Sequence, residues 1–453
     1  MLGKYPKTKI LATLGPACNT VKAIGELIKA GVSGFRLNFS HGDHTGMGEI
    51  YRFLKKAEIA SGRKVFIVQD LCGPKMRLGK LAGPQKLEKG RKFSFVNSEM
   101  QTSEDMLPLP INEIYPLIRK GERFFINDGL VEMRVLSTTG VDSFTALVVK
   151  DGIVSSGKGV NFPKQNFNFP AYTEKDLHDL RFNLQYPVDF VALSFVRTAA
   201  DITGLKRVMS RMGLDIPVIA KIEKSAALKN LKSILECCDA IMIARGDLAV
   251  EAGFAGIGVM QKNILSQSID AGKPVIVATQ MLETMTTSSV PTRAEITDIT
   301  NAVIDGADVL MLSGETATGD NPQLVVRTMS EVIRKAEQFS PSVPGAAFSI
   351  SGICDVTSSM AVQAAALMNA PAIVTPTMSG ATTRKIASLR PDSLIIAMTT
   401  NESQARRLLI HRGVCSETIG LYKSTDEMIR LVEKSIIRNK LLPRGINYVL
   451  TGG

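Results

Sequence analysis

The chain has 453 residues, enough for two or three domains, and its 45% apolar and 21% charged residues are the proportions of a globular protein. Its net charge is +11, but the basic residues are spread along the chain and no known nucleic-acid-binding module is recognisable, which argues against a nucleic-acid partner. A positive field favours anionic substrates such as phosphates. The sequence contains no run of eighteen apolar residues, so we expect no transmembrane helix.

Two further features predict a cytoplasmic location. The six cysteines show neither a CxxC pair nor the spacing of a zinc site, so we interpret them as reduced thiols. The amino end has only a short apolar run before Pro16 and lacks the apolar core of a signal peptide. We therefore expect this first run to be a buried strand.

Eight short apolar runs alternate with helical stretches in the first 313 residues. They are Thr8–Leu14, Gly34–Asn38, Val65–Asp70, Phe190–Ser194, Pro217–Lys221, Ala240–Ala244, Val275–Thr279 and Val309–Ser313. Strand-length runs separated by helices indicate parallel βα units. Eight such units predict an α/β fold, a closed (β/α)8 barrel of the TIM type.

Polar side chains crowd the carboxyl ends of seven of these runs. They are Arg36 and Asn38, Asp70, Ser194, Lys221 and Glu223, Arg245 and Asp247, Thr279 and Gln280, and Ser313 and Glu315. Because the active sites of such barrels lie at the carboxyl ends of the strands, these side chains should face one pocket. This layout is typical of an enzyme.

An all-β domain interrupts the barrel pattern after the third run. Between about Lys75 and Lys158, short alternating segments are separated by turn signals such as Asn127–Gly129 and Lys150–Gly152. We place this insert at residues 73–159. Its boundaries are rich in glycine and proline, so we expect hinges there and a lid that closes over the strand ends. A rigid appended domain is the alternative.

The rest of the chain divides into the barrel and a third domain. The barrel takes residues 1–72 and 160–340, and a loop-like linker, Phe339–Ser349, follows it. In residues 341–453 apolar runs again alternate with helical stretches, which predicts a smaller α/β domain.

Two carboxylates at neighbouring strand ends, Glu223 and Asp247, are suited to holding a divalent ion. Glu223 follows Lys221 by two residues and Asp247 follows Arg245 by two, so in an extended strand each pair points the same way. Magnesium takes one or two carboxylates and completes its octahedron with water and substrate oxygens. The spacing leaves an alternative open, namely two salt bridges within these pairs.

The same strand ends carry groups that bind anions. Arg36 and Lys221 would clamp a phosphorylated acid together with a metal and stabilise charge as a phosphoryl group moves. Gly246 lets a backbone N–H approach a carboxylate at a helix start. His41 and His44 could suggest a metal site, but they follow a strand with only one nearby aspartate, so we interpret them as loop or packing histidines.

Eight segments resemble those of the pyruvate kinase family and stand in its order. They are Arg36–His44, Gly73–Arg77, Lys158–Pro163, Ala220–Lys224, Ala244–Glu251, Ala278–Met285, Pro291–Asp298 and Ser313–Asp320. The resemblance covers nearly the whole chain. It implies transfer of the phosphoryl group of phosphoenolpyruvate to ADP, giving pyruvate and ATP in glycolysis.

The resemblance also implies roles for single residues. Glu223 and Asp247 would hold Mg²⁺ or Mn²⁺, and Lys221 would stabilise the transferring phosphoryl group and the enolate oxygen. Thr279 and Ser313 would belong to the proton path to the enolate carbon, and the immediate donor stays open.

The same resemblance implies one surface for the substrate and one for the nucleotide. Arg36 would belong to both, and it would be a further catalytic residue. The substrate would be bound by Arg36, Ser194, Lys221, Ala244, Arg245, Gly246, Asp247 and Thr279. Its carboxylate would lie at the backbone of residues 244–247. The nucleotide would face Arg36, Asn38, His41, Lys158 and Pro163.

One stretch departs from the common family pattern and bears on potassium. Members that need a bound potassium ion often read Thr-Lys-Gly-Pro-Glu where this chain has Leu-Cys-Gly-Pro-Lys75. The stretch is similar to the potassium-independent branch, because the Lys75 ammonium can supply the charge that the ion otherwise brings. The implied ion ligands are nevertheless present and could still bind one: Asn38, Ser40, Asp70 and the carbonyl of Leu71.

The carboxyl-terminal region resembles an effector domain in part. A phosphate cradle of Thr377, Ser379, Gly380 and Thr382 precedes or opens a helix and would suit a sugar phosphate or AMP. The alternative is a helix cap in a turn rich in hydroxyl groups. The glycine-rich loop that completes this site in relatives would follow the final Leu-Thr-Gly, where this sequence stops. Family resemblance implies a homotetramer.

Two other functions fit parts of the pattern. An enzyme that handles a magnesium-bound enolate, such as an aldolase, would keep Glu223 and Asp247 but would need neither a nucleotide lid nor Lys75. A non-catalytic sensor of phosphometabolites would be expected to lose Lys221, Glu223, Asp247 or Thr279, and all four are present.

Overall fold

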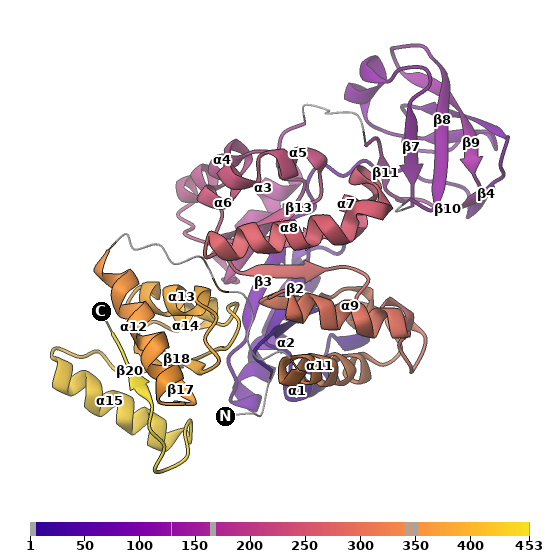
Figure 1. Cartoon of the computed structure of the whole chain (residues 1–453). Coiled ribbons are helices and arrows are strands. Elements are labelled where there is room, and N and C mark those ends of the chain that lie inside the picture. Colours follow the sequence, from indigo (N-terminus) through magenta and orange to yellow (C-terminus); the bar gives the residue numbers. More distant parts are fainter. Residues whose placement is uncertain (1–5, 128, 164–168, 340–344, 346–351, 453) are drawn as a thin grey trace.

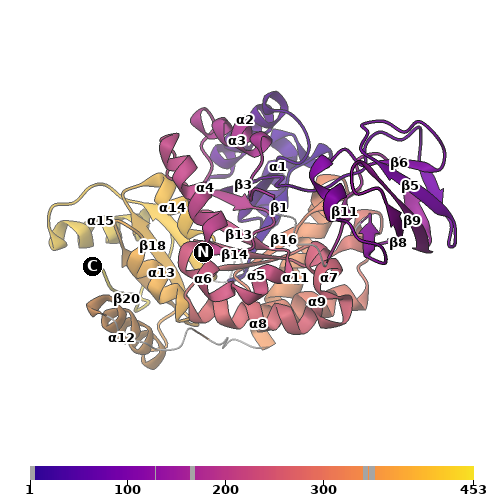
Figure 2. The same cartoon turned by 90° about the horizontal axis from the view of Figure 1, so that it is seen from above.

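The computed structural model describes residues 6–127, 129–163, 169–339, 345 and 352–452, which form three domains (Figure 1). A central barrel carries an all-β insert on one side and a smaller α/β domain on the other, so the two appended domains lie at opposite ends (Figure 2). Among these described residues, no helix combines the length and the apolar character that crossing a membrane requires.

Eight parallel strands close the barrel, as predicted. They are β1 (Lys9–Thr13), β2 (Gly34–Asn38), β3 (Phe66–Asp70), β12 (Phe190–Leu193), β13 (Val218–Ile222), β14 (Ala240–Ala244), β15 (Val275–Ala278) and β16 (Val309–Leu312). Their order around the barrel is β1-β16-β15-β14-β13-β12-β3-β2. Each strand corresponds to one apolar run of the sequence.

The barrel strands are apolar on both faces because both faces are covered. Adjacent residues belong to different clusters: Leu11 and Met242 pack in one, whereas Ile10 and Ile243 pack in another, together with helix residues. The smaller cluster draws on strands from all around the barrel and therefore fills its interior.

Helices cover the outside of the barrel. They are α1 (Val21–Ala30), α2 (His44–Ser61), α3 (Glu174–Leu180), α4 (Ala199–Arg211), α5 (Ser225–Lys229), α6 (Leu231–Cys237), α7 (Arg245–Ala252), α8 (Ile257–Asp270), α9 (Arg293–Ile304), α10 (Gly314–Ala317) and α11 (Pro322–Phe339). Side-chain hydrogen bonds to the backbone determine where some of these helices begin. Capping boxes, of Thr173 with Asp176 and of Thr292 with Glu295, satisfy the free N–H groups that open α3 and α9.

The insert has its own core and its own sheets. Its strands are β4 (Gln85–Leu87), β5 (Lys92–Val96), β6 (Met106–Pro108), β7 (Arg123–Ile126), β8 (Val131–Thr138), β9 (Ser143–Lys150), β10 (Gly152–Val154) and β11 (Val160–Asn161). Six of them form one sheet, in the order β11-β7-β8-β9-β5-β6, and β10 pairs with β4. Phenylalanines fill the core: the rings of Phe95 and Phe144 stack with centroids 4.9 Å apart, and those of Phe124 and Phe162 with centroids 4.6 Å apart.

The C-terminal domain is a layered α/β fold. Its elements are α12 (Ile353–Leu367), β17 (Ala372–Pro376), α13 (Ala381–Ser388), β18 (Leu394–Thr399), α14 (Glu402–Leu408), β19 (Val414–Thr418), α15 (Thr425–Arg438) and β20 (Val449–Leu450). The strands form one parallel sheet in the order β19-β18-β17-β20. Most of the predicted linker Phe339–Ser349 lies outside the described residues.

This domain docks on the amino-terminal end of the barrel. Leu409 and Ile410 join the interior cluster of the barrel. The Arg390 guanidinium meets the Asp308 carboxylate, just before β16, at 2.5 and 2.6 Å, and both side chains are almost fully buried. The opposite, carboxyl-terminal end of the barrel is therefore the one left available for a site.

Candidate active site

A cleft of about 420 Å³ lies at the carboxyl ends of the barrel strands, beside the insert. Its lining includes most of the predicted site residues, namely Arg36, Asn38, Ser40, His41, Asp70, Lys75, Lys158, Ser194, Lys221, Glu223, Ala244, Asp247, Thr279 and Ser313. Lys158 reaches it from the insert, whereas most of the others stand on or just beyond barrel strands. The fold thus brings residues nearly 280 positions apart in the chain to one cleft.

The Lys221 ammonium is at the centre of a buried charge cluster. Its Nζ lies 3.2 Å from Asp70 Oδ1 and 3.1 Å from Glu223 Oε1, and it donates to Ser194 Oγ at 2.7 Å. Burial by itself would lower the pKa of Lys221, but the two carboxylates outweigh it and raise the pKa above its usual value. The side chain is therefore a permanent cation at neutral pH.

Arg36 adds a second cation to the cluster. Its Nε donates to Asp70 Oδ2 at 2.7 Å, and its Nη1 donates to Thr13 Oγ1 at 3.2 Å. Burial favours the neutral form of Asp70, but Lys221 and Arg36 more than compensate and lower its pKa. Asp70 is thus a buried anion that positions two cations at the edge of the cleft.

Glu223 and Asp247 have the properties of a site for a hard divalent cation. Glu223 is almost fully buried and accepts the Phe195 N–H at 2.7 Å. Burial raises the pKa of Glu223, and the neighbouring Asp247 carboxylate raises it further, although Lys221 opposes both. A divalent cation between the two carboxylates would relieve this repulsion, so the donor set fits Mg²⁺ or Mn²⁺.

Lys75 reaches the same region from the start of the insert. Its Nζ lies 3.3 Å from Asp247 Oδ1. The lysine therefore brings a positive charge beside the Asp247 carboxylate in the cleft.

Arg245 does not face the cleft, and the expectation that it points the same way as Asp247 is wrong. β14 ends at Ala244 and α7 begins at Arg245. Side chains two residues apart point the same way in a strand but not in a helix, so Arg245 and Asp247 diverge. Its guanidinium contacts Asp298 Oδ2 at 2.6 Å and donates to the Thr279 carbonyl at 2.6 Å. Arg245 instead ties the start of α7 to the end of β15.

Three residues at strand ends beside the cleft adopt unusual backbone angles. Thr279 has a φ of 70°, Gln280 of 54° and Phe195 of 55°. Such angles are costly for residues other than glycine and cluster at functional sites. Thr279 Oγ1 accepts the Gly246 N–H at 3.0 Å and donates to the Ala278 carbonyl at 2.6 Å, so the twisted backbone aims its hydroxyl at the start of α7.

Comparison with known proteins agrees with this geometry. The family model described as the pyruvate kinase barrel domain matches residues 5–326, and that of the pyruvate kinase alpha/beta domain matches residues 355–453. The chain belongs to the pyruvate kinase family. It is therefore a kinase, a phosphotransferase.

Individual pyruvate kinases match over almost their full length. The enzyme of Corynebacterium glutamicum is 38% identical over 99% of this chain and 94% of its own. That of Mycobacterium tuberculosis H37Rv is 39% identical over 98% of this chain and 94% of its own. The crystal structure of a pyruvate kinase from Cryptosporidium parvum superposes with a TM-score of 0.89 at 34% identity, covering 99% of this chain and 94% of that one.

The residues predicted for the nucleotide do not all share the cleft. Asn38, His41 and Lys158 line it, whereas Pro163 is not among its lining residues and follows Phe162, which packs in the insert core. Burial, Arg77 and Arg36 lower the pKa of His41, so its imidazole is neutral at neutral pH.

Arg77 also lines the cleft, and sequence reasoning gave it no role. Its Nη1 donates to the Gly157 carbonyl at 2.9 Å, which links the two chain crossings between barrel and insert. The sequence did contain a signal for Arg77: it is a basic residue two positions after Lys75, and in an extended segment the two side chains point to the same side.

The potassium ligands implied by the family are largely engaged within the protein. Asn38 Oδ1 accepts the Ser40 N–H at 3.2 Å, and the Leu71 carbonyl accepts the Ser194 hydroxyl at 2.8 Å. The Asp70 carboxylate contacts Arg36 and Lys221.

The predicted effector residues lie at the opposite end of the molecule, around the start of α13. Gly380, with a φ of 80°, donates its N–H to Thr377 Oγ1 at 3.0 Å, whereas Thr382 is buried. Ser379 opens on a cleft of about 660 Å³ between the C-terminal domain and the barrel, which Lys273 also lines.

Proposed function

We propose that this pyruvate kinase transfers the phosphoryl group of phosphoenolpyruvate to ADP, with Mg²⁺ or Mn²⁺ and without a requirement for potassium, in the pyruvate-forming step of glycolysis. The observation that carries the proposal is the Lys221 ammonium, held between Asp70 and Glu223 inside the cleft. A fixed cation in a partly dehydrated site stabilises a charge that develops during reaction better than water does.

Arg36 and Lys221 bind the phosphoryl group and the enol oxygen. As the bond between phosphorus and this oxygen breaks, a bond forms to the terminal phosphate oxygen of ADP, and negative charge collects on the enolate. Lys221 lies where it can neutralise that charge. Bound Mg²⁺, held by Glu223 and Asp247, would supply additional charge neutralisation on substrate oxygens.

The substrate carboxylate fits the start of α7. The backbone N–H groups of Arg245 and Asp247 carry the positive end of the helix beside Gly246, whose own N–H is donated to Thr279 Oγ1, and Ser194 stands on the neighbouring side of the cleft. Arg245 serves this surface through its backbone, because its side chain braces β15.

The enolate carbon takes a proton to give pyruvate. Thr279 and Ser313 both line the cleft, and their hydroxyls belong to the path we propose for that proton. Thr279 is the better positioned of the two, because its hydroxyl contacts the start of α7, where the substrate carboxylate would lie.

The independence from potassium rests on Lys75. Its ammonium already lies 3.3 Å from Asp247, and three of the four residues that would hold the ion, Asn38, Asp70 and Leu71, have partners for their oxygen atoms within the protein. The test is pyruvate formation from phosphoenolpyruvate and ADP with Mg²⁺, in choline chloride and in potassium chloride. We expect equal turnover in both salts, and activity only with potassium would contradict this part of the proposal while keeping the enzyme.

A charge reversal sharpens the same test. In Lys75→Glu, the lost cation should be replaced by potassium from solution, so activity should fall at least about tenfold in choline and recover in potassium. The matched control is Lys89→Glu, an exposed lysine of the same insert. If both variants respond alike to potassium, Lys75 does not substitute for the ion.

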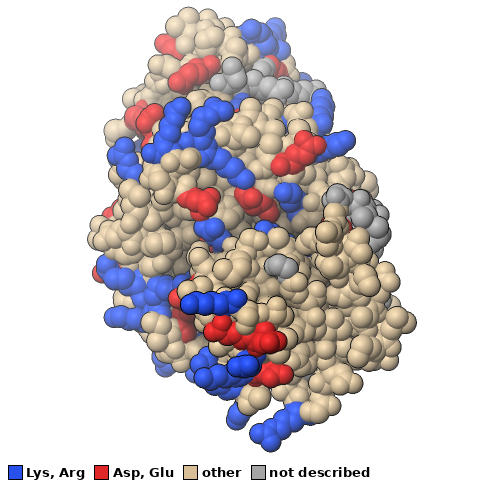
Figure 3. Space-filling view, turned by 90° about the vertical axis from the view of Figure 1, so that its left-hand side faces the viewer, with Lys and Arg blue, Asp and Glu red and all other residues tan. Residues whose placement is uncertain are grey.

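We also propose that the protein is cytoplasmic and assembles as a homotetramer through its C-terminal domain. The exposed face of α12 carries Ile353, Met360 and Leu367, which are 83%, 62% and 86% exposed. Figure 3 shows a broad area without charged side chains at its lower right, over this domain. An apolar area of this kind is typical of an interface. Sedimentation velocity should show a tetramer, and Leu367→Glu should dissociate it.

A regulatory role for the C-terminal domain is the remaining part of the proposal. Thr377, Ser379 and Gly380 lie at the start of α13, where helix N–H groups can hold a phosphate. Titration with phosphorylated sugars and AMP, with substrate cooperativity as the readout, tests it. Unchanged cooperativity with each of these compounds would contradict it.

A further inference from the structure

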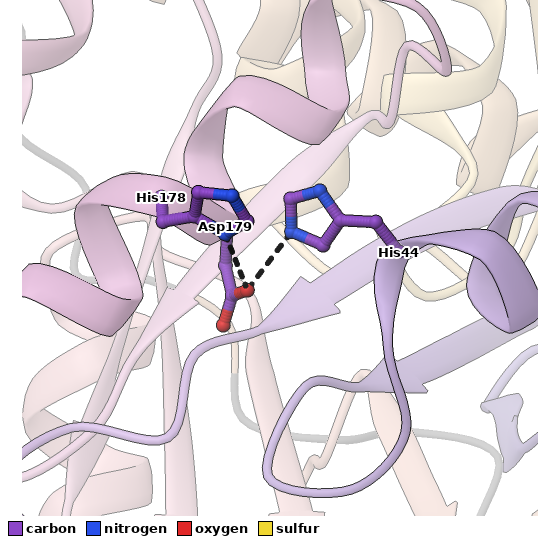
Figure 4. A group of neighbouring side chains, drawn as sticks. All are labelled: His44, His178 and Asp179. Atoms are coloured by element: carbon purple, nitrogen blue, oxygen red, sulfur yellow. Dashed lines mark hydrogen bonds and ion pairs between the residues drawn. The ribbon is translucent and has the colours of Figure 1, made fainter.

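A group of side chains of the kinds that can hold a metal ion lies on the outside of the barrel, apart from the cleft. His44 is the first residue of α2, and His178 and Asp179 lie on α3. Figure 4 shows both imidazole rings beside one oxygen of the aspartate. None of the three lines the active-site cleft.

The distances fit one ion. His44 Nε2 lies 3.0 Å and His178 Nδ1 3.9 Å from Asp179 Oδ1, and the three ligand atoms all lie within 4.8 Å of one another. Zinc bonds of about 2.0–2.2 Å in a tetrahedron place neighbouring ligands roughly 3.3 Å apart. The observed separations bracket that value, so small rotations of the two imidazole side chains would suffice.

Surrounding groups hold the carboxylate in place. Asp179 is buried, and its other oxygen, Oδ2, accepts from Lys175 Nζ at 2.5 Å. Lys175 also donates to the Phe39 carbonyl at 2.7 Å. Oδ1 is therefore directed at the imidazoles, as outer hydrogen bonds orient the ligands of known metal sites.

A hydrogen bond from His44 to Asp179 explains one histidine, but not the second. The His178 side chain is 65% exposed, yet its ring stacks on that of His44 with centroids 4.4 Å apart and an interplanar angle of 24°, which brings its Nδ1 towards the same oxygen. Two imidazoles and one carboxylate are ligands for zinc-like ions rather than for magnesium.

We propose that His44, His178 and Asp179 form a site for a divalent transition metal of the zinc class, separate from the magnesium site. Three protein ligands leave a fourth position for water, and the exposure of His178 gives the ion access from solvent. A bound ion joins α3 to the start of α2, and thereby to the loop of Ser40 and His41 at the edge of the cleft.

The test uses the full-length protein, freed of metal with a chelator and kept in excess Mg²⁺ so that the catalytic carboxylates are occupied. Titration with Co²⁺ should give one equivalent of binding and the visible absorption of a tetrahedral ion with nitrogen and oxygen ligands. Calorimetric titration with Zn²⁺ should give the same stoichiometry. Binding should raise the thermal midpoint.

His178→Ala is the decisive variant because its exposed side chain is not needed for folding. Its zinc affinity should fall at least about tenfold, a loss expected even when an outer partner of a ligand is removed. Cys354→Ser, which removes an exposed thiol, is the control and should bind as the wild type does. Equal zinc affinity of His178→Ala and the wild type would overturn the proposal, and so would binding that is lost in Cys354→Ser.

Discussion

Two buried aspartates lie at opposite ends of the barrel and can be compared directly. Asp308, at the amino-terminal end, contacts Arg390, and it accepts the backbone N–H groups of Val275 and Arg412 at 2.9 Å each. Asp70, at the carboxyl-terminal end, contacts Arg36 and Lys221. In both cases burial favours the neutral acid, and the cations nevertheless lower the pKa below its usual value.

The difference lies in what the partner cations face. Arg390 is 3% exposed and its contacts join two domains, so the pair with Asp308 holds the C-terminal domain on the barrel. Arg36 and Lys221 are 12% and 11% exposed and line the cleft. An ion pair of this kind is therefore structural when its cation is enclosed, and in the function we propose it serves catalysis when its cation faces a cleft.

The largest effect should come from Lys221→Met. In the function we propose, its interaction with the developing enolate is strongest in the transition state, so kcat should fall by about three to four decades, roughly 4–5 kcal/mol of barrier, with phosphoenolpyruvate binding largely kept. Steady-state kinetics measures this, with Lys229→Met, an exposed lysine nearby in the chain, as control. A variant that keeps its kcat would remove Lys221 from the mechanism.

At the other end of the barrel, Asp308→Asn should act on stability instead. It leaves the buried Arg390 without a counter-charge and should cost about 3 kcal/mol or more of unfolding free energy, with kcat kept at low temperature. Urea unfolding measures the loss. Asp305→Asn, which breaks a more exposed pair with Lys262, should cost about 1 kcal/mol or less. Similar losses in the two variants would mean that enclosure of the pair does not matter.

Asp247→Asn should separate metal binding from folding. One anionic ligand is lost, so the Mg²⁺ concentration for half-maximal activity should rise at least about tenfold, with nucleotide affinity changed less. Magnesium titration of activity provides the measurement. Superimposable curves for the variant and the wild type would exclude Asp247 as a ligand.

The smallest effect concerns pH at the domain junction. Burial lowers the pKa of His411 to about 4; Asp308 opposes this, whereas Arg384, Arg390 and Lys9 add to it. Because the folded pKa lies below the unfolded value of about 6.5, the contribution to stability is present above that pH and is lost as pH falls towards 4.

A variant isolates this contribution from others of opposite sign. Burial raises the pKa of Asp189 to about 7, so the contribution of Asp189 to the unfolding free energy is lost as pH rises. Asp189 is present in both the wild type and His411→Gln, so its contribution cancels in the difference between their unfolding free energies. The wild type should lose about 1 kcal/mol more than the variant between pH 7.5 and 5.5. If the unfolding free energies of the wild type and the variant change in parallel between pH 7.5 and 5.5, His411 does not have the lowered pKa that its burial requires.

The fold was largely predictable from the sequence because a barrel strand needs a short apolar run. The predicted runs Gly34–Asn38 and Ala240–Ala244 coincide with β2 and β14 residue for residue. The layered C-terminal domain followed from the same alternation. The exact end of a strand is less visible in a sequence, and this explains the error at Arg245, where helical periodicity begins one residue after β14.

The candidate site was predictable where it depends on strand order, and less so where it depends on contacts distant in sequence. Phe195 at a φ of 55° contradicts the preferences of an aromatic residue, so no local signal indicated it. His44 and His178 lie 134 positions apart and are joined only by the packing of α3 on the barrel. The motif around His44 led to the interpretation of His41 and His44 as loop or packing histidines, whereas tertiary packing brings His178 beside His44.

Thr279 has a consequence for attempts to improve this enzyme. A β-branched residue at a φ of 70° costs the fold about 1–3 kcal/mol, which glycine at the same position would recover. A library screened for heat resistance alone should therefore collect Thr279→Gly, and one screened for turnover should reject it. With the role we propose for Thr279, thermal selection and catalytic selection should favour different residues at this position, so a screen has to impose both.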